Sequence, residues 1–297
     1  MGNTAEVTVV GDTGDGGDFA QRRLTVLEHL WSRFIPTSDI SRLNMSRGEP
    51  ISVHPDTITL VKYLVSAHAF SNGYFDPTLL PTLVDLGYGA SRSDASKSSI
   101  LPANLPSLTE PLSRTLVDDI SNVVRLPVGL TFDPGGLGKG LAADIVALEL
   151  IRRGAIGACV NVGGDLRCVG DGPNDGVWDI DIESPFDASI TIAELAVCNG
   201  GVATSSTRAK RWSTRRGQFH HVISPATNEP LIESENAPVQ VTVIGAEAVW
   251  SEILATTILV AGASEGVSLA SQSQLGVLVV LNNGEVIPNS HWSEFQR

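Results

Sequence analysis

The chain has 297 residues, enough to bury roughly three quarters of its unfolded surface, so it needs neither disulfides nor a structural metal to fold. Hydrophobic residues make up 42% and charged residues 18%, which argues against wholesale disorder, collagen and a repetitive coiled coil. The net charge of −13 argues against binding to a phosphate backbone, and we expect no nucleic-acid partner.

Cysteine content and targeting segments narrow the class of protein further. Cys159, Cys168 and Cys198 are odd in number and show no C-x-x-C spacing, which argues against a zinc ribbon or a disulfide scaffold. The first ten residues carry no signal-peptide pattern, and no run of about 18 apolar residues occurs. We therefore expect no transmembrane segment, in a chain that is either cytoplasmic or exported after removal of a signal or lipobox.

Hydrophobic periodicity predicts the main elements along the chain. We expect a strand over 5–10, helices over 18–34 and 56–71, and a surface excursion rich in Ser, Pro and Asn over 90–115. A strand end at 130–133 precedes a glycine-rich turn and a helix over 140–152. Further strands are expected over 158–162, 177–182, 195–198, 219–223, 239–244 and 275–281, with a helix over 251–262. Because helices and hairpin-like strands do not alternate regularly, the pattern favours an α+β fold. We expect residues 1–297 to form one domain or two intimately packed subdomains.

The richest local signal is the turn Asp133-Pro-Gly-Gly-Leu-Gly-Lys-Gly140. Its glycines permit close backbone approach, the helix start favours an anion and Lys139 supplies a positive charge, all of which suit a pyrophosphate. The spacing matches neither a P-loop nor a dinucleotide fingerprint. A tight strand-to-helix turn without a ligand explains the same residues equally well.

Three weaker signals follow. Asn161-Val-Gly-Gly-Asp-Leu166 allows backbone to pack against a ligand or another strand. Gly200-Gly-Val-Ala-Thr-Ser-Ser206 and the later His220-His221 pair combine hydroxyls with a proton carrier, although the neighbouring histidines of a strand point to opposite faces. Glu252 and Thr256 lie four residues apart on one helical face and offer hard oxygen ligands suited to Mg²⁺, or form a solvated carboxylate and a helix-interior threonine.

Together with Ser38-Asp-Ile-Ser-Arg-Leu-Asn44 and Gly73-Tyr-Phe-Asp-Pro-Thr78, the order of these signals resembles the ApbE family from about Gly2 to Gly262. The resemblance implies a mixed α+β fold with largely antiparallel sheets and packed helices. It further implies FAD as substrate and Mg²⁺ as cofactor. Family members move the FMN half of FAD onto a Ser or Thr hydroxyl of a target flavoprotein and release AMP, and some hydrolyse FAD to FMN and AMP.

Residue by residue, the resemblance implies four groups of site residues. At the flavin it places Ser41, Asn44, Phe75, Asp76 and Thr78. For the rest of the cofactor it implies Asp133, Lys139, Asp144, Gly163, Gly164, Asp165, Thr204 and Ser205. The metal ligands it implies are Gly138 through its carbonyl, Glu252, Ala255 and Thr256. His221 corresponds to the family's proposed base.

Several positions depart from the family pattern. Gly138 replaces an alanine, Glu252 an aspartate, Ser206 a glycine and Ser224 another aspartate. The departures at Glu252, Ser206 and Ser224 leave a noncatalytic flavin-binding protein as an alternative to the transferase, and the hydrolysis of FAD by some family members leaves an FAD pyrophosphatase as another. The basic run over 208–216 is a solvated hairpin tip, a docking surface for an acidic target or a clamp on the nucleotide phosphates.

Overall fold

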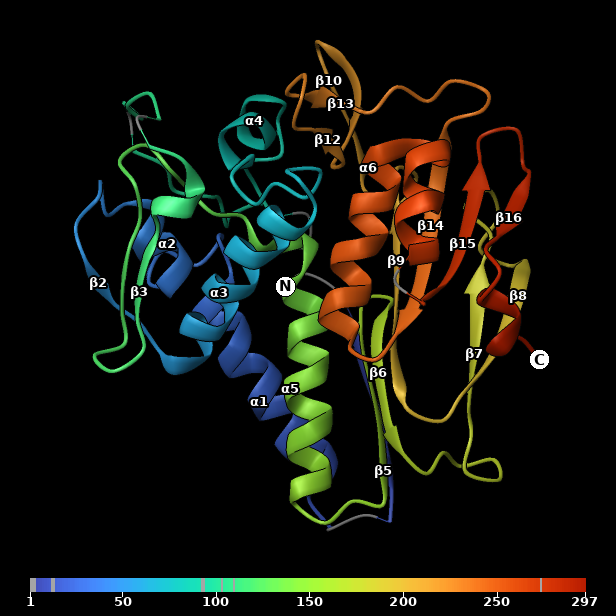
Figure 1. Ribbon diagram of the computed structural model, residues 1–297. Coiled ribbons are helices and arrows are strands. Elements are labelled where there is room, and N and C mark those ends of the chain that lie inside the picture. The colour runs from blue at the N-terminus through green and yellow to red at the C-terminus, as the bar shows by residue number, and fades with distance from the viewer. Residues whose placement is uncertain (1–3, 12–13, 92–93, 103, 109, 273) are drawn as a thin grey trace. The chain divides into compact units, whose positions relative to one another are not determined.

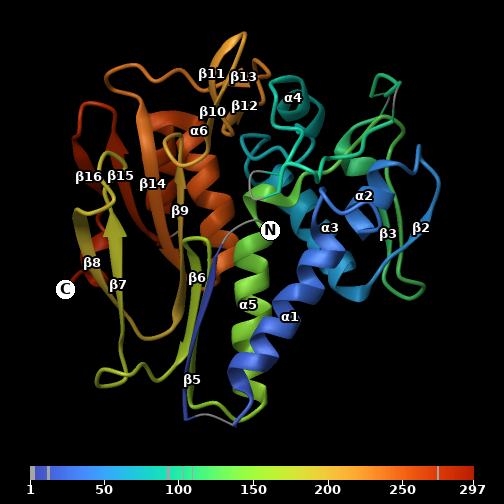
Figure 2. The same ribbon diagram turned by 180° about the vertical axis from the view of Figure 1, so that it is seen from behind.

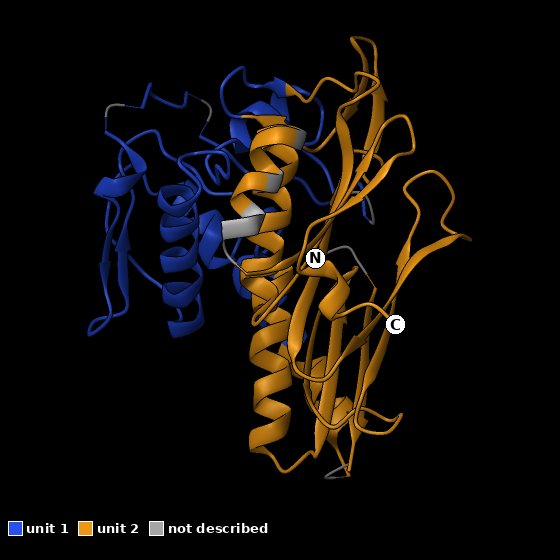
Figure 3. Cartoon of the chain, turned by 45° about the vertical axis from the view of Figure 1, so that its right-hand side comes forward, with its two compact units in different colours: residues 1–3, 24–138, 225–229 blue, residues 4–23, 139–224, 230–297 orange. Residues whose placement is uncertain are grey.

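Contacts within the chain divide it into two units, which Figure 3 colours blue and orange and which are described separately below. The computed structural model describes residues 4–11, 14–91, 94–102, 104–108, 110–272 and 274–297. Unit 1 comprises 24–138 and 225–229, and unit 2 comprises 4–23, 139–224 and 230–297. Of the expected surface excursion over 90–115, positions 92, 93, 103 and 109 lie outside the described residues. The single-domain organisation stays a prediction.

Unit 2 is built on a seven-stranded sheet in which every neighbouring pair is antiparallel (Figure 1). In spatial order its strands are β1 (Ala5–Val10), β5 (Gly157–Val162), β6 (Asp165–Gly170), β9 (Gly200–Ser206), β14 (Pro238–Gly245), β15 (Gly276–Leu281) and β16 (Val286–Pro288). The central strands β14 and β15 are almost fully buried, as expected for strands covered on both faces.

Each face of this sheet carries its own core. On one face, helix α6 (Ala248–Gln272) packs against β9 and β14, and its Leu254 and Ile258 meet Val241 and Val243. On the other face, the hairpin of β7 (Trp178–Glu183) and β8 (Thr191–Val197) buries Trp178 against Leu166. Figures 1 and 2 view unit 2 from opposite sides. Because successive side chains of a strand point to opposite faces of the sheet, neighbouring residues of one strand contribute to different cores.

Shorter elements complete unit 2. The helix α5 (Gly138–Arg152) begins with the last residue of unit 1, and α1 (Gly16–Trp31) continues from unit 2 into unit 1. A guanidinium–carboxylate pair joins Arg23 of α1 to Glu149 of α5, with Nε–Oε2 at 2.9 Å. The remaining elements are the hairpin β10 (Arg211–Thr214) and β11 (Gly217–His220), the strand β12 (Ile223–Ser224) and the 3-10 turn η3 (Trp292–Glu294). The strand β13 (Glu229–Pro230), the partner of β12, begins with the last residue of unit 1 and ends in unit 2.

Unit 1 is mainly helical. Its elements are α2 (Asp39–Asn44), β2 (Ile51–Ser52), α3 (Pro55–Phe70), α4 (Leu80–Asp85), η1 (Leu112–Arg114), β3 (Leu116–Asp118), β4 (Val123–Arg125) and η2 (Pro134–Gly136). The three strands form a small antiparallel sheet in the order β2-β4-β3. Helix α3 begins with Pro55 at its first position, where a missing N–H costs nothing, and Leu60 and Leu64 on one face are fully buried.

The α+β prediction is confirmed, and two local predictions are wrong. Residues 130–133 form no strand, because Asn44 hydrogen-bonds both the N–H and the carbonyl of Phe132 in place of a neighbouring strand. The strand expected over 219–223 is interrupted at His221, where the chain passes from β11 to β12. No helix among the described residues is long and apolar enough to cross a bilayer.

Candidate functional site

Three charged residues far apart in sequence meet in unit 2. Lys139 lies in the first turn of α5, Asp165 is the first residue of β6, and Glu252 lies in the first turns of α6. The Nζ of Lys139 pairs with Oδ2 of Asp165 and with Oε1 of Glu252. Their side chains are 13%, 2% and 3% exposed, respectively. This buried cluster brings together residues that the sequence assigned to phosphate, cofactor and metal.

The charges of this cluster do not balance. Two carboxylates share one ammonium group, so the formal sum is one negative charge. Burial lowers the pKa of Lys139, the charge of Glu252 opposes that effect, and Lys210 adds to it. Because buried charges are costly unless they are compensated, the cluster favours a further cation beside the carboxylates.

Backbone donors fix both carboxylates. The N–H of Gly140 donates to Oε2 of Glu252 at 2.7 Å, and the N–H of Thr204 donates to Oδ1 of Asp165 at 3.1 Å. A Cβ at Gly140 would lie 2.5 Å from the carbonyl oxygen of Ala248, so α5 and α6 approach each other through a glycine. The turn glycines therefore serve helix packing as well as any ligand.

Asp144 holds the start of α6. Its two oxygens accept the N–H groups of Ala248 and Val249 at 3.0 and 2.9 Å, and Oδ1 lies 3.4 Å from Nε of Arg167. Burial raises the pKa of Asp144 to about 6, although the two backbone donors and the positive charge of Arg167 lower it. In this position Asp144 caps the helix that carries Glu252, and its predicted contact with the cofactor stays a prediction.

The hydroxyls predicted at the cofactor divide between the two faces of the sheet. The Oγ of Ser205 lies 2.8 Å from Oγ1 of Thr256 on α6. The Oγ1 of Thr204 lies 2.9 Å from Oγ1 of Thr242, its cross-strand partner on the opposite face. Ser205 and Thr256 thus share the face of the charged cluster, whereas Thr204 reaches Asp165 through its backbone.

The two adjacent histidines have contrasting surroundings. Both ring nitrogens of His220 contact backbone, with Nε2 3.1 Å from the carbonyl of Leu231 and Nδ1 3.3 Å from the N–H of Val222. His221 instead has a buried Nδ1 for which no partner occurs among the described residues. Burial lowers the pKa of His221 to about 3, with help from the nearby positive charges of Lys210, His220 and Lys139. His221 is therefore neutral near pH 7, and its lowered pKa makes it a weaker base than an exposed histidine.

The glycine turn between β5 and β6 projects at the end of a regular hairpin. Gly163 and Gly164 have φ values of 65° and 97°, which favour glycine. The Oδ1 of Asn161 accepts the N–H of Gly164 at 2.9 Å and closes the turn. A Cβ at Gly164 would meet nothing within 4 Å, so the turn leaves room for a ligand to approach the backbone.

The residues predicted at the flavin fall in unit 1, where they support one another. The Oγ of Ser41 donates to the carbonyl of Arg33 at 3.4 Å, and Oδ1 of Asp76 accepts both the N–H and the hydroxyl of Thr78, at 2.8 and 2.7 Å. The ring of Phe75 lies against the glycine-rich turn over 133–140, where a Cβ at Gly136 would approach the ring to 2.8 Å. Their contact with flavin stays a prediction.

Arg33 is a residue of unit 1 that sequence reasoning missed. Its Nε lies 3.4 Å from Oδ2 of Asp133, and Nη1 donates to the carbonyl of Tyr88 at 3.1 Å. Its guanidinium stacks on the rings of Phe34 and Tyr88, at 4.3 and 4.7 Å from their centroids. A single arginine after a helix gives no periodic signal, so only the folded contacts reveal that it orients Asp133.

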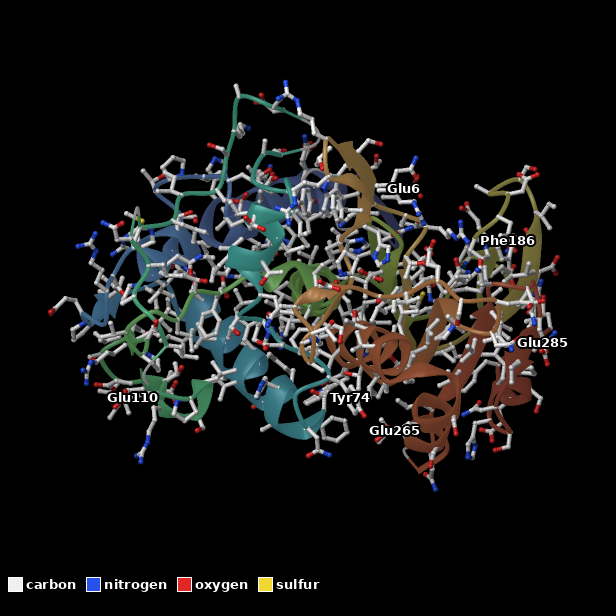
Figure 4. The ribbon with its side chains drawn as sticks, turned by 90° about the horizontal axis from the view of Figure 1, so that it is seen from above. Glu6, Tyr74, Glu110, Phe186, Glu265 and Glu285 are labelled. Atoms are coloured by element: carbon white, nitrogen blue, oxygen red, sulfur yellow. The ribbon has the colours of Figure 1, made fainter. Side chains whose placement is uncertain are left out.

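The basic run forms the expected hairpin, β10–β11. The Nη1 of Arg211 lies 2.7 Å from Oε1 of Glu233, and Nε of Arg208 lies 3.7 Å from the same oxygen. Arg208 also lies 5.8 Å from the ring centroid of Phe186, which is labelled in Figure 4. Two of the arginines therefore pair within unit 2, while docking and phosphate binding by this hairpin stay predictions.

The metal ligands predicted from the sequence are oxygen atoms of carboxylate, hydroxyl and backbone carbonyl groups. Within the described part of the chain, no group of three or more His, Cys, Asp and Glu side chains could hold a metal ion. The predicted metal residues in unit 2 are Glu252 with its carboxylate, Thr256 with its hydroxyl and Ala255, whereas Gly138 is the last residue of unit 1. Hard oxygen donors of this kind suit Mg²⁺, which keeps several waters or phosphate oxygens as further ligands.

Comparison with known proteins identifies the family. The model of the ApbE family matches residues 1–281. The chain belongs to the ApbE family. The match extends beyond the resemblance read from the sequence, which ended at about Gly262, and the extension includes β15.

Two curated relatives of this ApbE chain share the same name. A Vibrio cholerae protein is 25% identical over 274 residues, covering 89% of this chain and 78% of its own length. A Chlamydia muridarum protein is 27% identical over 233 residues, covering 78% and 71%. Both are named FAD:protein FMN transferase.

Solved structures show the same fold. The ApbE protein of Thermotoga maritima superposes with a TM-score of 0.84 at 21% identity, covering 99% of this chain and 96% of that one. The flavin transferase ApbE of Vibrio cholerae superposes with a TM-score of 0.79 at 23% identity, again covering 99% and 96%. The expected ApbE-like α+β fold is therefore confirmed.

Proposed function

We propose that this chain is an FAD:protein FMN transferase. It moves the FMN half of FAD to a Ser or Thr hydroxyl of a target flavoprotein and releases AMP, with Mg²⁺ as cofactor. The observation that carries the proposal is the buried cluster of Lys139, Asp165 and Glu252, with its excess of one negative charge. The names of the curated relatives support the same activity.

The residues present fit Mg²⁺. Glu252 and Thr256 lie four residues apart on α6, and both offer oxygen to the same face of the sheet as Asp165. A divalent cation would compensate the excess negative charge of the cluster. When bound, Mg²⁺ supplies positive charge that offsets the charge of the pyrophosphate.

The chain's own groups supply the proton transfer. The acceptor hydroxyl oxygen forms a bond to the phosphorus of the FMN half, while the bond from that phosphorus to the bridging oxygen breaks and AMP leaves with that oxygen. The hydroxyl proton passes to Nδ1 of His221, which is neutral and unpartnered among the described residues. A hydroxyl is a poor nucleophile until such a base lies within reach.

The direct test uses the full chain, FAD, Mg²⁺ and a candidate acceptor flavoprotein. We expect the acceptor to gain the mass of FMN and to fluoresce as a flavin in a denaturing gel, with AMP released in equal amount. An acceptor variant with Ala in place of the accepting Ser or Thr is the matched control. No added mass and no fluorescence on several acceptors would reject transfer.

The same reaction without an acceptor separates the two alternatives. Accumulation of free FMN and AMP would identify an FAD pyrophosphatase, in which water replaces the hydroxyl. Binding of FAD without AMP release would identify a noncatalytic flavin-binding protein. The Ser206 departure does not favour that second alternative, because its hydroxyl donates to the carbonyl of Val239 at 2.9 Å and accepts the N–H of Arg208 at 3.0 Å.

A further inference from the structure

Two thiols face each other across the hairpin β5–β6. Cys159 of β5 and Cys168 of β6 are direct partners in the antiparallel register, and their Sγ atoms lie 3.4 Å apart. Directly opposed residues of antiparallel strands have Cα atoms about 4.5–5.5 Å apart, which lies within the range that disulfides span. The backbone therefore already holds the two residues at a separation that a disulfide can bridge.

The two thiols are chemically unequal. Cys168 is fully buried in the core with Leu166 and Trp178, whereas Cys159 is partly exposed. The S–H of Cys168 donates to the sulfur of Cys159. This bond lowers the pKa of Cys159 and raises that of Cys168. The accessible sulfur is thus the better nucleophile, and the buried one lies behind it as a resolving thiol.

We propose that Cys159 and Cys168 are a site of oxidative modification, at which a peroxide closes an intramolecular disulfide. The thiolate of Cys159 attacks one oxygen of hydrogen peroxide, which gives a sulfenic acid and releases hydroxide. The sulfur of Cys168 then attacks Sγ of Cys159, and the sulfenic oxygen leaves as water with the thiol proton. Both sulfurs are oxidised and one peroxide is reduced, so atoms and electrons balance.

The disulfide would act on the hairpin and leave the charged cluster free. Cys168 shares its face of the sheet with Leu166, while Asp165 points to the opposite face, toward Lys139 and Glu252. The turn at Gly163 and Gly164 lies four residues beyond Cys159 and four residues before Cys168. The disulfide would therefore cross-link β5 and β6 at equal distances from the turn, without occupying the cluster of Lys139, Asp165 and Glu252.

The sequence between the thiols allows a decisive test. Trypsin cleaves after Arg153, Arg167 and Arg208, so Cys159 and Cys168 fall on separate peptides, 154–167 and 168–208. Because the second peptide also contains Cys198, the parent protein for the test is the full chain with Cys198→Ser. The folded parent is treated with hydrogen peroxide, its free thiols are alkylated in denaturant, and it is digested without reductant.

We expect the two peptides to be joined before reduction and separate after treatment with dithiothreitol. In the same background, Cys159→Ser and Cys168→Ala each abolish the joined species, and circular dichroism verifies that both variants fold. Because the joined peptide is measured on the parent itself, the test does not depend on the folding of either variant. Peroxide treatment of the urea-unfolded parent should give a several-fold slower closure, since the strands no longer hold the sulfurs together.

Two results would overturn the proposal. In one, both thiols remain fully alkylated at a peroxide concentration that oxidises the exposed Cys198 of the wild-type chain. In the other, Cys159 proceeds to sulfinic acid while the two peptides never join. Neither result bears on FMN transfer, so this proposal and the proposed function fail separately.

Discussion

His221 and His220 are neighbours in sequence that the fold separates chemically. His220 is held by backbone at both ring nitrogens, whereas Nδ1 of His221 is buried and has no partner among the described residues. Nothing in a histidine pair tells which member carries protons, so the sequence alone could assign His221 only through the family pattern. The contacts distinguish the two rings, and the role of His221 as the base stays a prediction.

Replacing His221 should remove chemistry and leave binding. For His221→Ala we expect transfer to slow by about 100-fold to 10,000-fold, the usual contribution of a general base, while FAD binds with unchanged affinity. Single-turnover kinetics and a flavin-binding titration measure the two quantities. The matched control, His220→Gln, should unfold at lower denaturant concentration and yet transfer FMN at near the wild-type rate when folded. Equal losses of rate in both variants would refute the assignment.

The pH dependence of kcat/KM for FAD reports the same residue. Burial disfavours the charged imidazolium, which lowers the pKa of His221 to about 3, so its neutral form persists as the pH falls from 8 to 5.5. We expect His221 to cause no loss of rate in this interval, although Asp144, whose pKa is about 6, titrates within it. A decline centred near pH 6.5 that persists in an Asp144→Asn variant would show that His221 titrates as an ordinary histidine.

Glu252 lends itself to a test of metal affinity. Glu252→Gln keeps an oxygen for the N–H of Gly140 and removes the charge, so half-maximal activity should require at least about tenfold more Mg²⁺. Glu252→Asp restores the family residue and should stay close to the wild type. Chelation with EDTA should abolish activity in all three proteins, and added Mg²⁺ should restore it. Activity that survives chelation would reject Mg²⁺ dependence.

At the scale of elements, the packing of α5 against α6 depends on a close contact at a glycine, which the hydrophobic pattern of a helix does not reveal. Gly140 lies against the carbonyl of Ala248, where Asp144 caps α6. Gly140→Ala should therefore lower the free energy of unfolding by about 1–3 kcal/mol, measured by urea titration.

The matched control for this substitution lies on another helix. A Cβ at Gly17 of α1 would meet nothing within 4 Å, and Gly17→Ala should leave stability unchanged or raise it by up to about 1 kcal/mol. Equal stability of the Gly140→Ala and wild-type proteins would contradict the close helix approach.

The sequence predicted most elements, and its errors have local causes. Regular apolar periodicity identified α3 and the central strands correctly. The segment 130–133 has the composition of a strand, but the amide of Asn44, 88 residues away, takes the place of a neighbouring strand. Such a long-range side-chain contact is invisible to a local pattern. The helix expected over 251–262 ends where the sequence predicted, because Gly262 has a non-helical φ of 85°, and a second helical segment follows it within α6.

Prediction of the candidate site was limited by distance along the chain. Lys139 and Glu252 are 113 residues apart. From the sequence, only the order of the family motifs indicated that the two residues belong to one site. Even so, the sequence treated Lys139 as a ligand for pyrophosphate and gave no sign that two carboxylates hold it. It also grouped Thr204 with Ser205, whose side chains lie on opposite faces of β9.

At the scale of the whole molecule, the net charge of −13 should destabilise the fold by self-repulsion. Salt screens charges over a Debye length of about 10 Å at 0.1 M, so added NaCl should raise Tm at pH 8 by about 2–4 °C, equal to about 1 kcal/mol. Near the isoelectric pH of about 4.8 the effect should vanish. Thermal scans at both pH values measure it, and a Tm that falls with salt at pH 8 would contradict repulsion.

If the two carboxylates of Asp165 and Glu252 hold the proposed cation, their unequal pairing with Lys139 makes activity and thermal stability compete. Converting either carboxylate to an amide would leave one ammonium facing one carboxylate, an arrangement that a metal-free fold tolerates better. A laboratory selection for heat resistance alone would therefore enrich variants that have lost a carboxylate, and with it the negative charge that the proposed cation would compensate. Any programme of stabilisation must keep both acids under selection for turnover.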